Sequence, residues 1–216
     1  MPAIDIAVLD LGGTTVRIGD VVEQAVRQVT GDQFDSVEFT AMRGASKLDL
    51  MTRLVGPASA PAAHAGFEEM IQSAVVSGEI TPMPGASEAI EEIRSRGTRV
   101  CLLTGFSESI HRSMLERFGW VESVDLALSP SQELRGRPWP DLILTAAARL
   151  HTSGMDAVAV VGDTTNDVEA ARRAGAGICA AVLTGAHRRS TLAGANPTHI
   201  LSDLAEFVEI ITPPAD

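Results

Sequence analysis

The sequence is short of basic residues, cysteine and long apolar runs, and each shortage excludes a class of protein. Its 17 basic residues face 28 acidic ones, which gives a net charge of −11. So acidic a chain has no broad positive surface for a polyphosphate backbone, and we expect no nucleic-acid binding. No apolar run approaches the ~18–20 residues that cross a bilayer, and the N-terminus lacks the basic-then-apolar order of a signal peptide. We therefore expect no membrane association.

Cysteine and lysine are also scarce. The two cysteines, Cys101 and Cys179, both lie in apolar runs. They cannot build a disulfide framework, which favours reduced core residues of a cytoplasmic protein. Tyrosine is absent altogether, and Lys47 is the single lysine beside 16 arginines. The position of that one primary amine is therefore of interest.

Short apolar runs alternate with amphipathic stretches along most of the chain. The runs lie at 4–11, 98–104, 157–162 and 178–183, with a weaker one at 124–128. Runs of this length, rich in Val, Ile and Leu, are typical of buried parallel strands. Helical patterns cover 86–96, 108–118, 139–150, 165–174 and 201–211. The alternation predicts an α/β fold with a Rossmann-like parallel sheet.

Residues 16–82 depart from this alternation. Three helical patterns, at 21–30, 46–55 and 64–77, follow one another without a convincing strand. The Pro/Ala stretch 57–63 is interpreted as a linker or turn, and 81–85 as the return to the core. We therefore predict a core domain of residues 1–15 and 83–216, with a helical cap domain of residues 16–82 inserted after the first strand.

Polar residues follow three of the predicted strands. Asp10 ends the first, Thr104 and Gly105 follow the second, and Asp163 and Asp167 follow the fourth. The carboxyl ends of parallel strands meet at one edge of a sheet, where ligands bind. Carboxylates converging there suit Mg²⁺, and they are poor zinc ligands without His or Cys.

Neighbouring groups in these segments suit a phosphate. Backbone amides at small residues such as Gly13 and Gly105 can hold phosphate oxygens. Arg137 supplies a fixed cation. A single Asp after a strand is more often a turn or helix cap, and GDTTND alone could be a capped helix start. Asp10, Thr104, Arg137, Asp163 and Asp167 each follow an element that is expected to end at the same edge of the sheet. This arrangement favours a shared site.

With these residues in place, the sequence resembles the haloacid dehalogenase superfamily of phosphoryl-transfer enzymes. The four motifs of that superfamily match DLGGTTV, LLTGF, GRP and GDTTND, between positions 10 and 167. The resemblance implies that Asp10 is a nucleophile that forms an aspartyl-phosphate. It implies Mg²⁺ held by Asp10, the Gly12 carbonyl, Asp163 and Asp167, and a transferring group held by Thr104 and Arg137.

One position departs from the superfamily pattern. Most of its phosphatases and mutases carry a second Asp two positions after the nucleophile, where this chain has Gly12. That Asp protonates the leaving oxygen, and general acid catalysis contributes typically ~10²–10⁴-fold. The phosphonatase branch also lacks this Asp, and DLGGTTV, GRPWP and LTGAH resemble its segments. In that branch the substrate, phosphonoacetaldehyde, forms an imine with a cap lysine.

The segment that matches the lysine loop is RGASK, which ends in Lys47. An arginine could not replace this lysine, because a guanidinium stays protonated and forms no imine. A covalent role, a simple binding role and no role all remain open for Lys47. Arg43, in the same segment, is a candidate substrate contact that could also lower the pKa of Lys47. Because Arg43 replaces a Met of the phosphonatase pattern and tyrosine is absent, the chain is most similar to the phosphonatase-like hydrolase group.

These patterns favour a Mg²⁺-dependent hydrolase of a small phosphonate, with Asp10, Lys47 and Arg137 as catalytic residues. Two alternatives are kept: a phosphate monoester phosphatase that lacks the second Asp, and a non-catalytic binding protein on the same fold. His187 is interpreted as a helix-capping or surface residue rather than a phosphate ligand. The resemblance also makes a homodimer through the cap possible.

Overall fold

The computed structural model describes residues 3–212 and contains a six-stranded sheet with the order β5-β4-β1-β6-β7-β8. Every neighbouring pair in this sheet is parallel. The strands are β1 (Ile6–Asp10), β4 (Arg99–Leu103), β5 (Leu126–Leu128), β6 (Val158–Gly162), β7 (Ile178–Val182) and β8 (His199–Leu201). The α/β fold with a parallel sheet is therefore confirmed.

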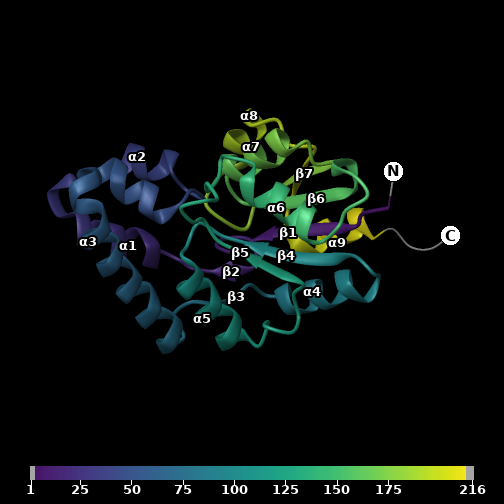
Figure 1. Ribbon diagram of the computed structural model, residues 1–216, viewed down its shortest axis with the longest axis horizontal. Coiled ribbons are helices and arrows are strands. Elements are labelled where there is room, and N and C mark those ends of the chain that lie inside the picture. Colours follow the sequence, from purple (N-terminus) through teal and green to yellow (C-terminus); the bar gives the residue numbers. More distant parts are fainter. Residues whose placement is uncertain (1–2, 213–216) are drawn as a thin grey trace.

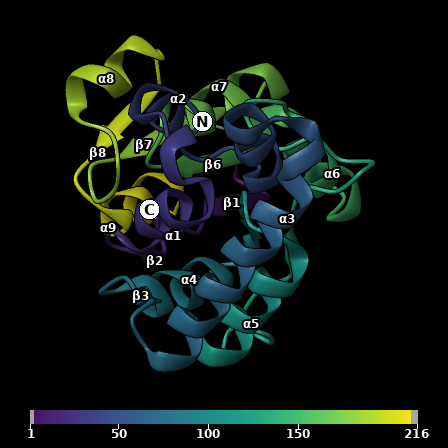
Figure 2. The same ribbon diagram turned by 90° about the vertical axis from the view of Figure 1, so that its left-hand side faces the viewer.

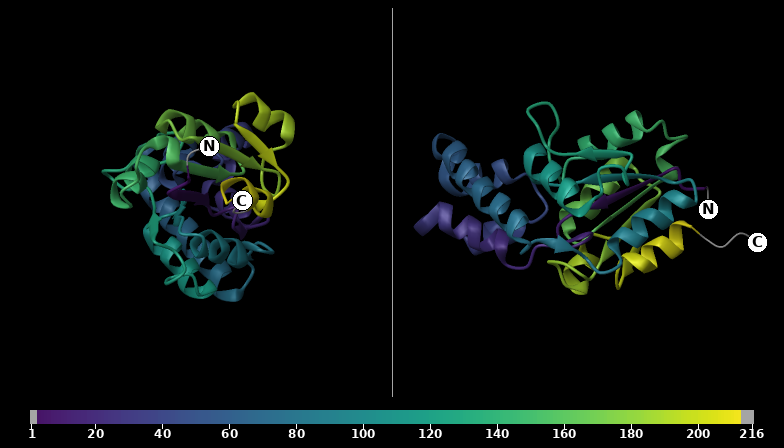
Figure 3. Two further views of the ribbon diagram at one scale, coloured as in Figure 1. Left: turned by 90° about the vertical axis from the view of Figure 1, so that its right-hand side faces the viewer. Right: turned by 90° about the horizontal axis from the view of Figure 1, so that it is seen from below.

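Helices cover both faces of the sheet (Figures 1 and 3). One face packs against α4 (Ala86–Ser95), α5 (Glu108–Phe118) and α9 (Leu204–Ile211), and the other against α6 (Asp141–Arg149) and α7 (Thr165–Ala174), with α8 (Arg189–Gly194) beside α7. Along β1, Ala7 and Leu9 face the first set, whereas Ile6 and Val8 face the second. All five residues of β1 are buried, which explains the unbroken apolar run.

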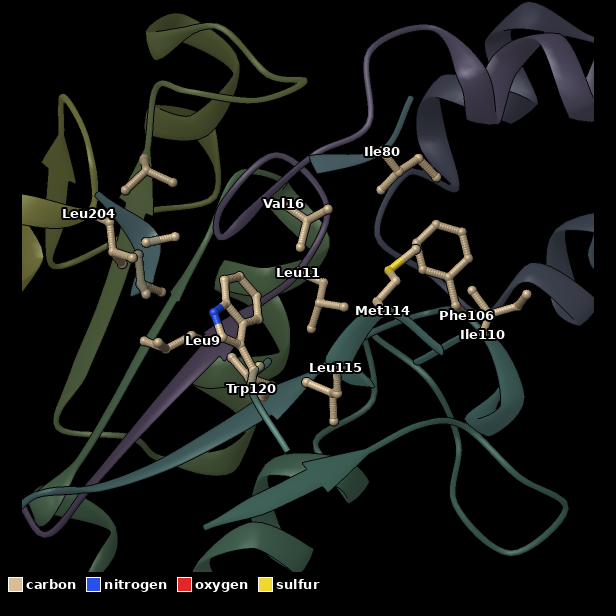
Figure 4. Close-up of a cluster of buried hydrophobic side chains, with 14 of the residues drawn as sticks. Leu9, Leu11, Val16, Ile80, Phe106, Ile110, Met114, Leu115, Trp120 and Leu204 are labelled. Carbon is tan, nitrogen blue, oxygen red and sulfur yellow. The ribbon is translucent and has the colours of Figure 1, made fainter. Parts of the chain in front are cut away.

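A cluster of apolar side chains joins the sheet to the base of the helices that follow β1. Figure 4 shows Leu9 and Trp120 close together beside the strands of the sheet, with Val16 and Ile80 farther towards the helices that follow β1. The indole of Trp120 is buried and donates a hydrogen bond to the Ser87 hydroxyl at 2.9 Å. Trp120 is thus part of this apolar cluster and is tied to α4 through Ser87.

Residues 16–82, which we call the helical segment, lie at one end of the sheet (Figure 1). Their elements are β2 (Val16–Arg17), α1 (Val21–Thr30), the 3-10 turn Gly31–Gln33, α2 (Ser36–Ala41), α3 (Lys47–Ser77) and β3 (Thr81–Pro82). The short strands β2 and β3 pair antiparallel where the segment leaves and rejoins the core. Figure 2 shows α1, α2 and α3 together on this side of the molecule.

The linker predicted at 57–63 is wrong, because these residues are helical. Helix α3 runs through them and is kinked at Gly56, whose φ of 79° and ψ of 161° are not helical. Pro57 follows the kink, where the missing proline N–H costs little. The alanines that follow favour helix, and Ala60 is buried. The two helices predicted at 46–55 and 64–77 are thus two halves of one kinked element.

Several short elements have no counterpart in the sequence-based prediction. They are β2, β3, β8, α2 and α8, each of two to six residues. Runs of this length carry too few residues to show a hydrophobic period. Cys101 and Cys179 are buried free thiols. No helix within residues 3–212 is long and apolar enough to cross a membrane.

Candidate active site

The carboxyl ends of β1, β4 and β6 meet at one edge of the sheet. Asp10 is the last residue of β1 and pairs in register with Leu103 of β4, so Thr104 follows directly beside it. Asp163 follows β6 on the other side of β1. A pocket at this edge is lined by residues that the sequence singled out: Asp10, Gly12, Arg43, Lys47, Thr104, Gly105, Arg137 and Asp163. Gly13 lines the adjoining cleft.

Asp10, Asp163 and Asp167 form a cluster of buried carboxylates. Each offers an oxygen that lies within 4.8 Å of the other two. Asp163 Oδ2 accepts the Ala186 N–H at 2.6 Å, and Asp167 Oδ2 accepts the Thr164 N–H at 2.9 Å. Burial raises the pKa of Asp10 to about 6, and the pKa of Asp163 is also raised, chiefly by desolvation.

The donor set of this cluster fits a hard divalent cation. All the side-chain donors are carboxylate oxygens, which Mg²⁺ prefers. Three buried carboxylates face one guanidinium, so the cluster holds more negative charge than Arg137 neutralises. Gly13 has φ +88°, and a Cβ there would lie 2.4 Å from Asp163 Oδ2. Only glycine therefore lets the loop after β1 close over this carboxylate.

Arg137 lies buried between two of the carboxylates. Its Nη1 donates to Asp10 Oδ1 at 2.5 Å and also to Asp167 Oδ1. Its Nε has no hydrogen-bond partner among residues 3–212. A buried cation beside Asp10 can offset the charge of an incoming phosphoryl group.

Lys47 is the first residue of α3, and its side chain enters the same pocket from the helical segment. It is 7% exposed, its Nζ donates to the Ala45 carbonyl at 3.1 Å, and the ammonium lies 5.2 Å from the centre of the Phe106 ring. Within residues 3–212 it forms no ion pair, since no carboxylate oxygen lies within 4.0 Å. Burial, and then the charge of Arg137, lowers the pKa of Lys47 to about 8.

Arg43 lines the pocket from the loop that precedes α3. Its guanidinium lies 3.4 Å from Glu23 Oε2 and 4.9 Å from the Phe39 ring centre. Glu23, on α1, also pairs with Arg27. Arg43 is thus anchored within the helical segment and is not bound to the carboxylate cluster. Nothing in the sequence indicated Glu23 as its partner.

Two further residues contact the loop or the helix that builds the site. Asn166 Nδ2 donates to the carbonyls of Ala41 and Arg43, at 3.0 and 2.6 Å. His187 is buried, and its Nδ1 accepts the N–H of Thr165 in the first turn of α7 at 3.1 Å. The structure thus shows the helix-capping alternative for His187. Asn166 lies inside the GDTTND motif, but backbone carbonyl acceptors leave no trace in a sequence.

Comparisons with known proteins find hydrolases of similar sequence. The chain is 30% identical over 200 residues to a phosphoglycolate phosphatase of Cereibacter sphaeroides, and the match covers 88% of each chain. It is 28% identical over 120 residues to a phosphonoacetaldehyde hydrolase of Nitratidesulfovibrio vulgaris, which covers 54% of this chain and 42% of that enzyme. The chain spans about half or less of the length of several curated relatives that it matches.

Solved structures share the fold. A putative phosphoglycolate phosphatase from Lactobacillus delbrueckii subsp. bulgaricus superposes with a TM-score of 0.82, at 17% identity, over 98% of this chain and all of that one. At that identity the likeness shows the fold alone. The family description of the haloacid dehalogenase-like hydrolases matches residues 4–175, which include all four motifs. The chain therefore belongs to the haloacid dehalogenase-like hydrolase family.

Proposed function

We propose that this hydrolase cleaves the C–P bond of a small phosphonoaldehyde such as phosphonoacetaldehyde, with Asp10 as nucleophile and Lys47 as imine-forming amine. One observation carries the proposal: Lys47 places a buried amine, with no carboxylate partner within residues 3–212, in the pocket that contains Asp10. Burial and the charge of Arg137 lower its pKa to about 8. An amine must be neutral to attack an aldehyde, and desolvation favours that form.

The proposed reaction uses both groups. The Lys47 amine condenses with the aldehyde and releases water. Asp10 then attacks phosphorus, and the electron pair of the breaking C–P bond passes into the iminium to form an enamine. The enamine takes a proton on carbon, and water hydrolyses the resulting imine and the aspartyl-phosphate. These hydrolyses return the amine and the carboxylate and release acetaldehyde and phosphate.

The remaining residues position and neutralise the reacting group. Asp10, Asp163, Asp167 and the Gly12 carbonyl would hold Mg²⁺, which supplies positive charge to the phosphoryl oxygens. Thr104, Gly105, Gly13 and Arg43 are proposed to bind substrate. Arg137 is proposed to stabilise charge on the transferring group. We propose that residues 16–82 act as a cap over the site and that residues 1–15 and 83–216 form the core domain.

Gly12 supports this reaction over ester hydrolysis. An alkoxide leaving group needs a proton, and Gly12 occupies the position where a general acid would stand. An enamine leaving group needs no proton on oxygen. This chain therefore lacks the group that only the ester reaction requires.

Hydrolysis of a small phosphate monoester is the second candidate. It is favoured by the phosphoglycolate phosphatase of Cereibacter sphaeroides, which matches 88% of this chain at 30% identity. In that reaction Lys47 would act only as a cation that contacts the substrate. The two candidates therefore differ in whether Lys47 forms a covalent bond.

Borohydride trapping separates the two candidates. The enzyme is incubated with Mg²⁺, phosphonoacetaldehyde and borohydride, and the peptide that contains Lys47 is examined by mass spectrometry. We expect a reduced adduct on Lys47, and loss of phosphonoacetaldehyde turnover in Lys47→Arg. As a control, p-nitrophenyl phosphate hydrolysis by Lys47→Arg is expected to fall far less. Absence of the adduct together with full turnover by Lys47→Arg would contradict the imine and favour the phosphatase.

A further inference from the structure

The loop of residues 41–47, between α2 and the start of α3, is tied to the core by the side chain of Asn166. We propose that Asn166 is a positioning residue, a latch that holds this loop on the core and so keeps Lys47 in the pocket beside Asp10. Its amide nitrogen donates to two backbone carbonyls of the loop, those of Ala41 at 3.0 Å and Arg43 at 2.6 Å.

The chemistry of the two acceptors makes the latch specific for an amide. Both partners of Asn166 are carbonyl oxygens, so the group between them must be a donor. A carboxylate of the same shape would place negative charge against two oxygens and would repel them. Asp at this position is therefore expected to be more damaging than simple removal of the side chain.

Glycines let the loop approach the core closely enough for these bonds. Gly44 has φ +80°, and a Cβ there would lie 2.5 Å from the Thr164 hydroxyl. At the other end of the loop, a Cβ at Gly105 would lie 2.1 Å from the Ala45 carbonyl. The Lys47 N–H then donates to the Gly105 carbonyl at 2.9 Å. The loop thus contacts the segments that follow β6 and β4.

Asn166 connects the lysine loop to the carboxylate cluster through the first turn of α7. Asn166 lies in the first turn of α7, directly before Asp167 of the carboxylate cluster. Lys47 lies three residues beyond Gly44, at the start of α3. Because Asn166 has a fixed place beside Asp167, its bonds to the loop set the position of Lys47 relative to the carboxylates. The role of Lys47 in catalysis rests on the proposed function, whereas the latch rests on these contacts alone.

The single lysine offers a direct test. We expect an amine-acylating reagent that is too bulky for the pocket to modify Lys47 when the loop opens, because Lys47 is 7% exposed. We compare the acylation rate of Lys47, followed by peptide mass spectrometry, in wild type, Asn166→Ala and Asn166→Asp without substrate. Gln72→Ala is the matched control, since Gln72 of α3 also makes a side-chain hydrogen bond to the core, to Ser113 of α5 at 2.9 Å.

We expect acylation of Lys47 to be about five- to fiftyfold faster in Asn166→Ala, the size expected for two lost hydrogen bonds, and faster still in Asn166→Asp. Gln72→Ala should stay within about twofold of wild type. Amide hydrogen exchange of residues 42–50 should accelerate in the same order, while exchange in β1 and β4 stays unchanged. That last comparison separates a local opening from a folding defect.

Unchanged acylation and exchange in Asn166→Ala would overturn the latch. So would an effect confined to Asn166→Asp, because added charge would then explain it. Steady-state kinetics with phosphonoacetaldehyde give a further readout: KM should rise about tenfold in Asn166→Ala with kcat within about threefold, since substrate binding can close the loop. Failure of borohydride trapping in wild type would contradict the proposed function and leave the acylation result intact.

Discussion

The sheet and the helical segment contribute to the site by different physical means. Strand β1 is buried along its whole length, and Asp10 is fixed because the strand that carries it is fixed. Helix α1 buries only one face, with Val22, Ala25 and Val26 inside. The loop that carries Lys47 is held instead by a few polar contacts and close approaches, such as those of Asn166 and Gly105. The buried strands of the sheet therefore position the carboxylates. The amine of Lys47 is positioned by the docking of its loop onto the core.

Removal of the nucleophile should give the largest effect and should leave the helical segment unchanged. We expect Asp10→Asn to lower phosphate release by about 10⁴-fold or more, because an amide is a poor nucleophile. Amide hydrogen exchange of residues 42–50 should stay near the wild-type rate, since docking of the loop does not depend on turnover. Retained Mg²⁺-dependent turnover would place the nucleophile elsewhere. If neither protein releases phosphate, the non-catalytic alternative gains support.

Substitutions of buried side chains in the sheet and in the helical segment should speed hydrogen exchange in different parts of the molecule. Leu102→Ala in β4, at a fully buried position, should cost about 2–5 kcal/mol of unfolding free energy. Phe67→Ala in α3 removes a ring stacked 6.2 Å from that of Phe106, and large aromatic truncations cost about 3–5 kcal/mol. We expect the first to speed hydrogen exchange throughout the sheet and the second to speed it first in α1 and α3.

Val76→Ala, at a side chain that is 69% exposed on the same helix as Phe67, serves as the control. Its effect should lie within about 0.5 kcal/mol. Equal loosening of sheet and helices by Phe67→Ala would show that the two regions unfold as one unit.

The buried amine should make stability depend on alkaline pH. Burial, and then Arg137, lowers the pKa of Lys47 from 10.5 to about 8. The unfolded chain then binds more protons than the folded one between these pH values, so stability rises with pH across this window. The gain is at most about 3 kcal/mol. Urea unfolding of wild type and Lys47→Met at pH 8 and above should differ by this slope, because the buried thiols of Cys101 and Cys179, whose pKa values are raised by burial, contribute equally to both proteins. An equal slope in both proteins would place the amine in solvent.

The smallest change in activity is expected from a substitution at Gly12, in the loop that joins β1 to the helical segment. Gly12→Asp adds a carboxyl group two positions after Asp10, and its Cβ would meet only the flexible end of Ile18, at 2.9 Å. We expect hydrolysis of an alkyl phosphate such as phosphoglycolate to rise by up to about 10²-fold, because a general acid can then protonate the alkoxide leaving group. Gly12→Asn is the matched control, since its amide cannot supply that proton. An equal rise in both variants would exclude proton donation as the cause.

The sequence-based predictions are most reliable where a residue follows a long buried strand. Asp10, Thr104 and Asp163 lie at the ends of β1, β4 and β6, and the apolar runs before them were sufficient to predict those strands. The prediction was wrong at 57–63, where prolines suggested a linker. Pro57 follows a kink at Gly56, and the alanines sustain the helix. The prolines of this stretch thus favoured a linker, whereas its alanines favoured a helix.

The roles assigned to the site residues remain proposals. Some of their features were visible in the sequence, whereas their contacts were not. Lys47 was singled out by its rarity, but its burial and its lack of a carboxylate partner within residues 3–212 depend on how α3 docks. The Glu23 contact of Arg43 and the loop contacts of Asn166 had no sequence signal. Such contacts join residues 20 to 125 positions apart, and no local period records them.

By itself, the sequence determined the α/β alternation, the order of polar residues after the strands and the single amine. These features follow from short-range patterns, because a run of neighbouring apolar residues indicates both that a strand is buried and where it ends. Only the tertiary structure decided that Arg137 lies between Asp10 and Asp167 and that the amide of Asn166 holds the lysine loop. The contacts of Asn166 depend on backbone carbonyls and on the close approach of glycines, and the ion pairs of Arg137 join residues 30 and 127 positions apart. Both arise only when distant segments of the chain pack together.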